Sequence, residues 1–297
     1  MWTELLQKNG FPFVGNAPMT RHTSIGVGGA VSAYMEPEDR ESLIRAIDLC
    51  RFYQIPFRVL GRGTNVIAFD RPMTQIVICT RKLNALTKNK AYITAECGAS
   101  LRQLALFALA QGMVGFAGLL DIPGSVGAAV RGNAGAFGDF ICQHLAQVEV
   151  YDAAKHRVRS ILADALSYGY RSSFLVQARD LFLLSATFSF PMGDTLREQE
   201  RIRECRLART KTQPLSSRSC GSVFRRYEGV GAGVYLEKAG CKGLCRGGAQ
   251  ISPQHANFIV NVSSATADDV LFLIDEARER VYRAFGILLV PEAEKII

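Results

Sequence analysis

The stretch best suited to bind a ligand through its backbone is residues 118–138, which read GLLDIPGSVGAAVRGNAGAFG. It holds six glycines and four alanines, and its only charged residues are Asp121 and Arg131. Glycine is unfavourable inside helices and strands, so this density requires a reason. A flexible linker would be rich in serine and charge, whereas this stretch contains Ile122 and Val126. We therefore expect backbone N–H groups that face a bound ligand, at positions where a side chain would collide with it.

A second glycine turn, Gly61–Asn65, directly follows the short strand-like segment 57–60. Backbone N–H groups exposed in such a turn can form a nest for a phosphate. The turn does not complete the dinucleotide fingerprint GxGxxG, because residue 66 is valine and no helical pattern follows it. No other pair of glycines completes that fingerprint or a P-loop. Phosphate contact and an ordinary tight turn both remain open for this segment.

Side chains that could act on a bound anion come later in the chain. Tyr170 and Arg171 are adjacent, and residues 211–224 gather basic and hydroxyl side chains in a predicted loop. Taken singly, Arg171 is typical of a surface arginine and Ser222 of a turn serine. The helix predicted at 195–208 mixes arginine with glutamate, which is compatible both with a solvated face and with contacts to an anion.

The eight cysteines show no metal or disulfide framework. The closest pair, Cys241 and Cys245, is spaced CxxxC, and the nearest histidine, His255, has no second histidine beside it. Zinc sites normally show paired CxxC-type spacings, so we expect no metal and interpret most cysteines as buried thiols of a reducing cytosol. The N-terminus has no signal-peptide core, and residues 104–130 contain too many polar and glycine interruptions for a membrane helix.

The net charge of the chain indicates which kind of molecule it binds. The 297 residues include 35 Lys and Arg against 27 Asp and Glu, for a net charge of +8, with 48% hydrophobic residues. This composition indicates a soluble chain with a sizeable core, long enough for two or three domains. A basic protein that binds nucleic acid also needs a basic face with stacking aromatics or a reading motif, and neither is found. Small anions are therefore the expected partners.

The elements that must position these residues alternate in type along the chain. We predict helices at 37–53, 100–111, 195–208 and 266–285, the second opened by a capping box at Ser100 and Gln103, the last capped at Thr266 and closed by Gly286. Residues 1–19 are expected to be a loosely ordered lead-in. Strands are predicted at 31–35, 57–60, 74–79, 91–96, 148–151 and 181–190. The chain is therefore α+β, with an N-terminal region to about residue 190 and a C-terminal domain after it. Composition and pattern alone indicate no more than a soluble protein that binds an anionic, nucleotide-like ligand.

Eight motifs follow one another in a fixed order along nearly the whole chain. They are His22–Gly29, Leu60–Asn65, Ile122–Gly127 with Asn133–Gly138, Tyr170–Ser173, Cys220–Phe224, Ala239–Gly243, Ser252–Phe258 and Pro291–Glu292. Together they resemble one family, the UDP-N-acetylmuramate dehydrogenases, also called UDP-N-acetylenolpyruvoylglucosamine reductases, and the ordered set is more specific than any one motif. The N-terminal half alone resembles only the wider flavin fold of the vanillyl-alcohol oxidases.

The resemblance implies a flavoprotein of peptidoglycan precursor synthesis in the cytoplasm. Its fold would be a two-subdomain FAD-binding part of the vanillyl-alcohol-oxidase type, at 1–80 and 81–190, followed by a smaller α+β substrate-binding domain at 191–297. FAD would be held noncovalently and reduced by NADPH, and UDP-N-acetylglucosamine enolpyruvate would be the substrate. The family further implies a monomer without nucleic-acid or membrane partners. The chain has no insertion after Phe174 and so resembles the shorter subtype.

The resemblance also assigns residues to roles. Ser222 matches the proton donor, Arg171 the partner of the substrate carboxylate, and Glu292 the carboxyl group that helps to stabilise the intermediate. An arginine fork suits a carboxylate on which negative charge develops. Tyr170, Lys211 and Arg225 match substrate contacts. The expected FAD contacts are Gly61, Arg62, Gly63, Thr64, Asn65, Ile122, Pro123, Gly124, Ser125, Gly127, Asn133, Ala134, Gly135 and Gly138.

Some positions depart from the family pattern and motivate two alternatives. Thr64 stands in place of the usual serine, and Asp121 precedes Ile-Pro-Gly where a small residue is common. Phe137 replaces a common tyrosine, and Glu294 stands where arginine is frequent. The first alternative is a related FAD-linked oxidase or dehydrogenase of another substrate, in which a histidine such as His22 could tether the flavin. The second is a non-catalytic flavin-binding protein.

Overall fold

The computed structural model describes residues 2–296, which form two compact units. Unit 1 comprises the chain up to Phe13 and the segments Tyr34–Arg62 and Ile76–Leu207. Unit 2 comprises Val14–Ala33, Gly63–Gln75 and the chain from Ala208 onward. The chain passes from one unit to the other several times, so neither unit is continuous in sequence. The predicted division into three domains, with boundaries at residues 80 and 190, uses segments that are continuous in sequence, and it stays a prediction.

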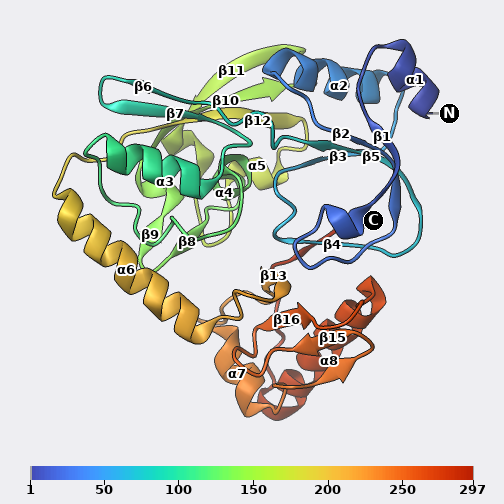
Figure 1. Cartoon of the computed structure of the whole chain (residues 1–297), viewed down its shortest axis with the longest axis vertical. Coiled ribbons are helices and arrows are strands. Elements are labelled where there is room, and N and C mark those ends of the chain that lie inside the picture. Colours follow the sequence, from blue (N-terminus) through green and yellow to red (C-terminus); the bar gives the residue numbers. More distant parts are fainter. Residues whose placement is uncertain (1, 297) are drawn as a thin grey trace. The chain divides into compact units, whose positions relative to one another are not determined.

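A five-stranded antiparallel sheet forms the centre of unit 1 (Figure 1). Burial alternates along β12, as expected for a strand with one face on the core. The strands predicted at 91–96, 148–151 and 181–190 are confirmed with small shifts of their ends. The order is β11 (Arg157–Leu162), β10 (Leu145–Asp152), β12 (Leu181–Phe188), β7 (Tyr92–Glu96) and β6 (Leu86–Asn89).

Two helices of unit 1 place the glycine-rich stretch against this sheet. The helix α3 (Leu101–Ala110) opens with the predicted capping box: Ser100 Oγ accepts from Gln103 N at 3.1 Å, and Gln103 Oε1 accepts from Ser100 N at 2.9 Å. The short helix α4 (Val126–Arg131) lies inside the glycine-rich stretch and packs against β12, β7 and α3. Their apolar sides join the sheet in one continuous core.

The N-terminal prediction is wrong. The lead-in is ordered, because Leu6 is buried and anchors helix α1 (Trp2–Lys8), and strand β1 (Val14–Pro18) follows it. The next helix, α2 (Arg40–Phe52), starts at Arg40 because Asp39 caps it. A four-stranded sheet has the order β1, β2 (Ala30–Met35), β5 (Met73–Cys79), β3 (Phe57–Leu60), with β3 and β5 parallel.

In unit 2, an antiparallel sheet packs on the long helix α8 (Ala267–Phe285) (Figure 1). Thr266 and Gly286 cap this helix as predicted. Ile25, Val27 and Ile67 join the core of this unit, so early segments of the chain complete it. The sheet order is β13 (Arg218–Ser222), β16 (Phe258–Asn261), β15 (Ala249–Ile251), β14 (Cys245–Arg246), and β4 (Val66–Ala68) pairs in parallel with β17 (Glu294–Ile296).

The remaining elements are short, apart from one long helix that begins in unit 1 and ends in unit 2. Within residues 2–296, no helix has the length and apolar character that crossing a membrane requires. The long helix is α6 (Thr195–Thr212), and the others are η1 (Met19–Arg21), β8 (Gly135–Ala136), β9 (Asp139–Phe140), η2 (Ile141–Gln143), η3 (Ala163–Leu166), α5 (Phe174–Gln177) and α7 (Ala232–Lys238).

Candidate active site

The two glycine loops of unit 1 lie against each other. A Cβ added at Gly61, just after β3, would lie 2.3 Å from Ser125 Oγ. The Ser125 hydroxyl also accepts a long hydrogen bond from Ala128 N, at 3.4 Å, and caps α4. The structure therefore brings together Gly61 and the segment Ile122–Ser125, both of which are predicted cofactor contacts. The same clash explains why residue 61 has no side chain.

The second arm of the glycine stretch is a tight hairpin. Strands β8 and β9 pair directly, and the two residues between them, Phe137 and Gly138, both have positive φ, of 54° and 88°. Two residues of positive φ are the geometry of a type I′ turn, which favours glycine. Asn133 precedes the hairpin and donates through Nδ2 to Gly169 O at 3.0 Å. This bond ties the arm to the turn that carries Arg171.

Arg171 occupies a strained position at the corner of a turn. Gly169 and Ser172 exchange backbone hydrogen bonds of 3.0 and 3.3 Å, so Tyr170 and Arg171 form the two-residue tip. Arg171 has φ 52°, which is uncommon for a residue other than glycine and is often found at functional sites. Its Nη1 lies 3.5 Å from Gly135 O, and its guanidinium lies 5.7 Å from the centre of the Tyr170 ring.

The residues of unit 1 fit a bound flavin nucleotide. Asn133 is buried, yet its Oδ1 accepts no hydrogen bond from the described residues, and the buried Tyr168 hydroxyl also has no partner there. Burial raises the pKa of Tyr168, so the hydroxyl stays protonated and can donate. Within residues 2–296, the backbone N–H group of Arg62 makes no hydrogen bond. A ligand with N–H groups, carbonyl groups and phosphates could satisfy these atoms.

Several glycines of the stretch are required by the chain itself. A Cβ at Gly118 would lie 2.2 Å from Ala136 O, and one at Gly127 would lie 3.0 Å from Cys97 O. At Gly135 it would lie 2.3 Å from the Phe140 ring. Neighbouring segments of the chain therefore already exclude a side chain at these three positions, and the expected ligand contacts of Gly127 and Gly135 stay predictions.

In unit 2, Ser222 and Glu292 lie on adjoining segments. Ser222 ends β13 and pairs with Phe258, and the next residue, Val223, accepts a hydrogen bond at its O from Glu292 N at 2.7 Å. Asn65 joins the same place by donating through Nδ2 to Glu292 O at 3.1 Å. Three residues from distant motifs, Asn65, Ser222 and Glu292, therefore meet in one part of unit 2.

Asn257 holds this region in place, and no role was assigned to it from the sequence. It is buried, its Oδ1 accepts from Phe224 N at 2.9 Å, and its Nδ2 donates to Phe224 O at 2.9 Å. Its backbone oxygen accepts from Val223 N. An asparagine side chain that pairs with both polar groups of one peptide residue fixes the backbone directly after Ser222. Its place in the Ser252–Phe258 motif was the signal that could have identified it.

The other predicted contacts of unit 2 lie at its ends and turns. Lys211 is exposed in the last turn of α6, where its O accepts from Gln254 Nε2 at 3.3 Å. Arg225 pairs through its N with Val290 O at 2.9 Å, and its buried Nε has no partner among the described residues. Gly63 has φ 67°, and a Cβ there would lie 2.0 Å from His22 O. Thr64 follows it in the same turn.

The predicted catalytic residues belong to different units: Arg171 to unit 1, and Ser222 and Glu292 to unit 2. Within unit 1, Gly61 lies against Ser125, and the arm Asn133–Gly138 contacts the Arg171 turn through Asn133 and Gly135. Within unit 2 the structure gathers Asn65, Ser222 and Glu292.

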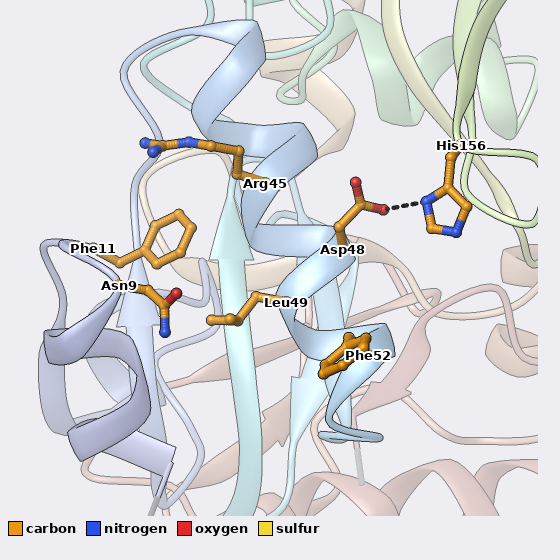
Figure 2. Close-up of a pocket in the computed structure, with 7 residues that line it drawn as sticks. All are labelled: Asn9, Phe11, Arg45, Asp48, Leu49, Phe52 and His156. Carbon is orange, nitrogen blue, oxygen red and sulfur yellow. Dashed lines mark ion pairs between the residues drawn. The ribbon is translucent and has the colours of Figure 1, made fainter.

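A separate surface pocket of about 390 Å³ in unit 1 contains none of the predicted site residues (Figure 2). Its carboxylate is already paired: Asp48 lies 3.3 Å from His156 Nδ1 in the pocket and accepts from the Tyr151 hydroxyl outside it. The Arg45 guanidinium lies 5.3 Å from the centre of the Phe11 ring. These paired groups show no unsatisfied chemistry for a ligand, so the glycine loops remain the better candidate.

Two family models match separate parts of the chain. A family described as "FAD binding domain" matches residues 19–160, and one described as "UDP-N-acetylenolpyruvoylglucosamine reductase, C-terminal domain" matches residues 213–296. The expected α+β fold, with a FAD-binding part followed by a C-terminal domain, is thereby confirmed.

Whole-length relatives give the family. The UDP-N-acetylenolpyruvoylglucosamine reductase of Carboxydothermus hydrogenoformans is 36% identical over 98% of this chain and 96% of its own, and that of Clostridium beijerinckii is 38% identical over 93% and 90%. The crystal structure of UDP-N-acetylenolpyruvylglucosamine reductase from Thermus caldophilus, at 30% identity, covers 97% of this chain and all of its own with a TM-score of 0.83. The chain belongs to the UDP-N-acetylenolpyruvoylglucosamine reductase family.

Proposed function

We propose that this chain reduces UDP-N-acetylglucosamine enolpyruvate to UDP-N-acetylmuramate in the cytoplasm, with NADPH as the electron source, as a step of peptidoglycan precursor synthesis. The observation that carries the proposal is the similarity to named reductases over 98% of the chain. The residues expected for the reaction are all present: Arg171, Ser222 and Glu292. The chain is proposed to act as a monomer with three domains, 1–80, 81–190 and 191–297.

The FAD would be held noncovalently by the backbone of the two glycine loops. Gly61–Asn65, Ile122–Ser125 with Gly127, and Asn133–Gly135 with Gly138 are the proposed contacts. The unpaired N–H group of Arg62 suits a phosphate oxygen, and Asn133 Oδ1 suits an N–H donor. Bound FAD would supply the chemistry that no side chain offers, the transfer of a hydride from NADPH to C3 of the enolpyruvyl group.

The chain's own residues would orient the substrate and supply the proton. Arg171 would pair with the substrate carboxylate, and its fork suits the negative charge that grows there as the hydride arrives. Ser222 would donate its hydroxyl proton to C2, which completes the addition of hydride and proton across the double bond. A serine is a weak acid, but an enol-like carbon is basic enough to accept from it. Glu292 would help to stabilise the intermediate, and Tyr170, Lys211 and Arg225 would bind the UDP-sugar.

The test separates the two half-reactions. The purified protein is mixed with NADPH and then with the enolpyruvyl sugar, while flavin absorbance is recorded. We expect bleaching on the first addition and full recovery on the second. Bleaching without recovery would contradict the proposed substrate and favour a related flavin enzyme, and an absence of bleaching would favour a non-catalytic flavin-binding protein.

A further inference from the structure

The part of α6 that belongs to unit 1 holds the glycine-rich region through charged side chains. Glu198, Arg201 and Arg206 each reach a different part of residues 115–139. They lie three and five residues apart along the helix, so neighbouring turns of one helix supply all three contacts. A solvated face was one of the two interpretations of this helix, and these contacts exclude it for Glu198, which is buried.

The first contact gives two backbone N–H groups a carboxylate acceptor in place of a backbone carbonyl. Glu198 is 6% exposed, and its Oε1 accepts from Gly115 N at 3.0 Å and from Phe116 N at 2.9 Å. These two N–H groups belong to irregular backbone and have no strand partner. Gly115 O is in turn bound at 2.7 Å by His144 Nε2. Side chains therefore fix the entry to the glycine-rich stretch on both sides.

The second contact joins the two ends of the proposed FAD-binding loops. Asp139 is 6% exposed, its Oδ1 lies 2.5 Å from Arg201 Nη2, and its Oδ2 accepts from Gly118 N at 2.7 Å. Gly118 precedes the first loop arm, whereas Asp139 ends the hairpin that forms the second. The hydrogen bond to Asp139 raises the pKa of Arg201, so the guanidinium keeps its charge. One arginine therefore holds the carboxylate that bridges the two ends of the glycine-rich stretch, Gly118 and Asp139.

The third contact is more exposed. Asp121 accepts from Arg206 Nε at 2.8 Å and Nη2 at 3.1 Å, and from Arg102 Nη1 at 2.9 Å. The acidic residue at 121, where the family commonly has a small one, is thus matched by two arginines of this chain. Surface pairs contribute little, so the buried contact at Asp139 is the one that matters.

We propose that Arg201 is a positioning residue for FAD: through Asp139 it fixes the distance between the arms 122–127 and 133–138. This inference rests on the proposed function, because those arms are the proposed FAD contacts. The pair joins a buried carboxylate to an arginine side chain that is 40% exposed. Such a pair contributes little net stability, but it imposes a definite geometry. Loop spacing is a property that such a geometry can determine.

The experiment measures FAD release from the full-length holoprotein after dilution, by the rise in flavin fluorescence. We expect Arg201→Gln and Asp139→Asn each to weaken FAD binding by about tenfold or more, as for the loss of a buried charge-assisted hydrogen bond. Arg201→Lys should recover part of the loss. The control is Arg203→Gln, an exposed arginine of the same helix, which should stay within about twofold of wild type.

A double variant and the stability of the FAD-free proteins test whether Arg201 and Asp139 act as one pair. Combined, Arg201→Gln and Asp139→Asn should weaken FAD binding no more than the stronger single change, because both remove one interaction. The thermal midpoint of each FAD-free variant should stay close to that of FAD-free wild type, so that a loss of stability does not account for the weaker FAD binding. Release equal to that of Arg203→Gln, or additive losses, would overturn the inference.

The inference and the proposed function fail in different ways. A protein that holds FAD but returns no electrons to the enolpyruvyl sugar contradicts the proposed function and leaves the role of Arg201 standing. A protein that binds no FAD overturns both.

Discussion

At the scale of single residues, the proposed chemistry depends on groups whose backbone the fold fixes. Ser222 lies at the end of a strand, directly before a residue that Asn257 and Glu292 both contact through hydrogen bonds. Arg171 is held with φ 52° at the tip of a turn. Such a conformation costs of order 1–3 kcal/mol, which the surrounding structure must supply.

Ser222→Ala should keep NADPH-driven bleaching of the flavin but slow its recovery with substrate. Ser222 is proposed to act only in the second half-reaction, where loss of a general acid typically costs about 100-fold or more. Stopped-flow absorbance measures both phases. The control is Ser217→Ala, an exposed serine of the preceding loop that should leave both unchanged. An equal loss in both half-reactions of Ser222→Ala would show that the assigned role is wrong.

His255 should make unit 2 sensitive to acid. Burial, and after it the charge of Lys242, lower the pKa of His255, while its Nδ1 accepts from Asn257 N at 3.1 Å. The unfolded chain therefore binds this proton more readily than the folded one. Stability is fully present above a pH of about 6.5 and is lost as the pH falls from there towards the lowered pKa of the folded state.

Urea unfolding at several pH values checks this expectation. The urea concentration at the unfolding midpoint of wild type should decrease as the pH is lowered from 7 to 5. The decrease should be smaller for His255→Asn. The same dependence of the urea midpoint on pH in both proteins would show that groups other than His255 cause the acid sensitivity.

At the scale of elements, the glycine-rich region is a set of loops packed on one another. The helix α4 separates its two arms, the hairpin β8–β9 packs under Gly118, and α6 binds the region from outside. Its glycines thus serve two purposes, close packing within the chain and exposure of backbone to the proposed ligand.

Gly118→Ala should disrupt this packing, since its Cβ would lie 2.2 Å from Ala136 O, a backbone atom that cannot rotate away. We expect a loss of about 1–3 kcal/mol in the free energy of unfolding, typical of overpacking. The matched control is Gly132→Ala in the same stretch, where the nearest atom is Ala128 O at 3.4 Å and φ is −95°. Chemical denaturation of both variants measures the difference, and equal losses would refute the packing argument.

At the scale of the whole molecule, the chain combines a FAD-binding part with the C-terminal domain of one reductase family. Some flavin enzymes of the wider fold tether the cofactor through histidine, and His22 lies near a glycine turn. Acid precipitation should release all flavin into the supernatant, because the FAD is proposed to be noncovalent. Flavin that remains in the pellet, measured by its absorbance after redissolving, would favour the tethered alternative.

The sequence determined the local structure wherever one segment carries its own signal. Capping residues at Ser100 and Thr266 and the alternation of β12 depend on neighbours within a few positions, so they could be predicted. The lead-in was mispredicted because α1 depends on burying Leu6, a contact that no local pattern reveals. The family and its motifs could also be identified, because residue types in a fixed order identify a family without any knowledge of contacts.

Only the tertiary structure decided which segments share a unit and which side chains hold the loops. The chain enters unit 2 three times, so Ile25 and Ile67 share a core with α8, although more than 190 residues separate them from it. The bonds from Glu198 and Arg201 to residues 115–139 likewise join segments about 60 to 80 residues apart. A charged helix has the same sequence pattern whether its side chains meet water or a buried carboxylate. Long-range packing alone distinguishes the two, and here it places Arg201 on Asp139.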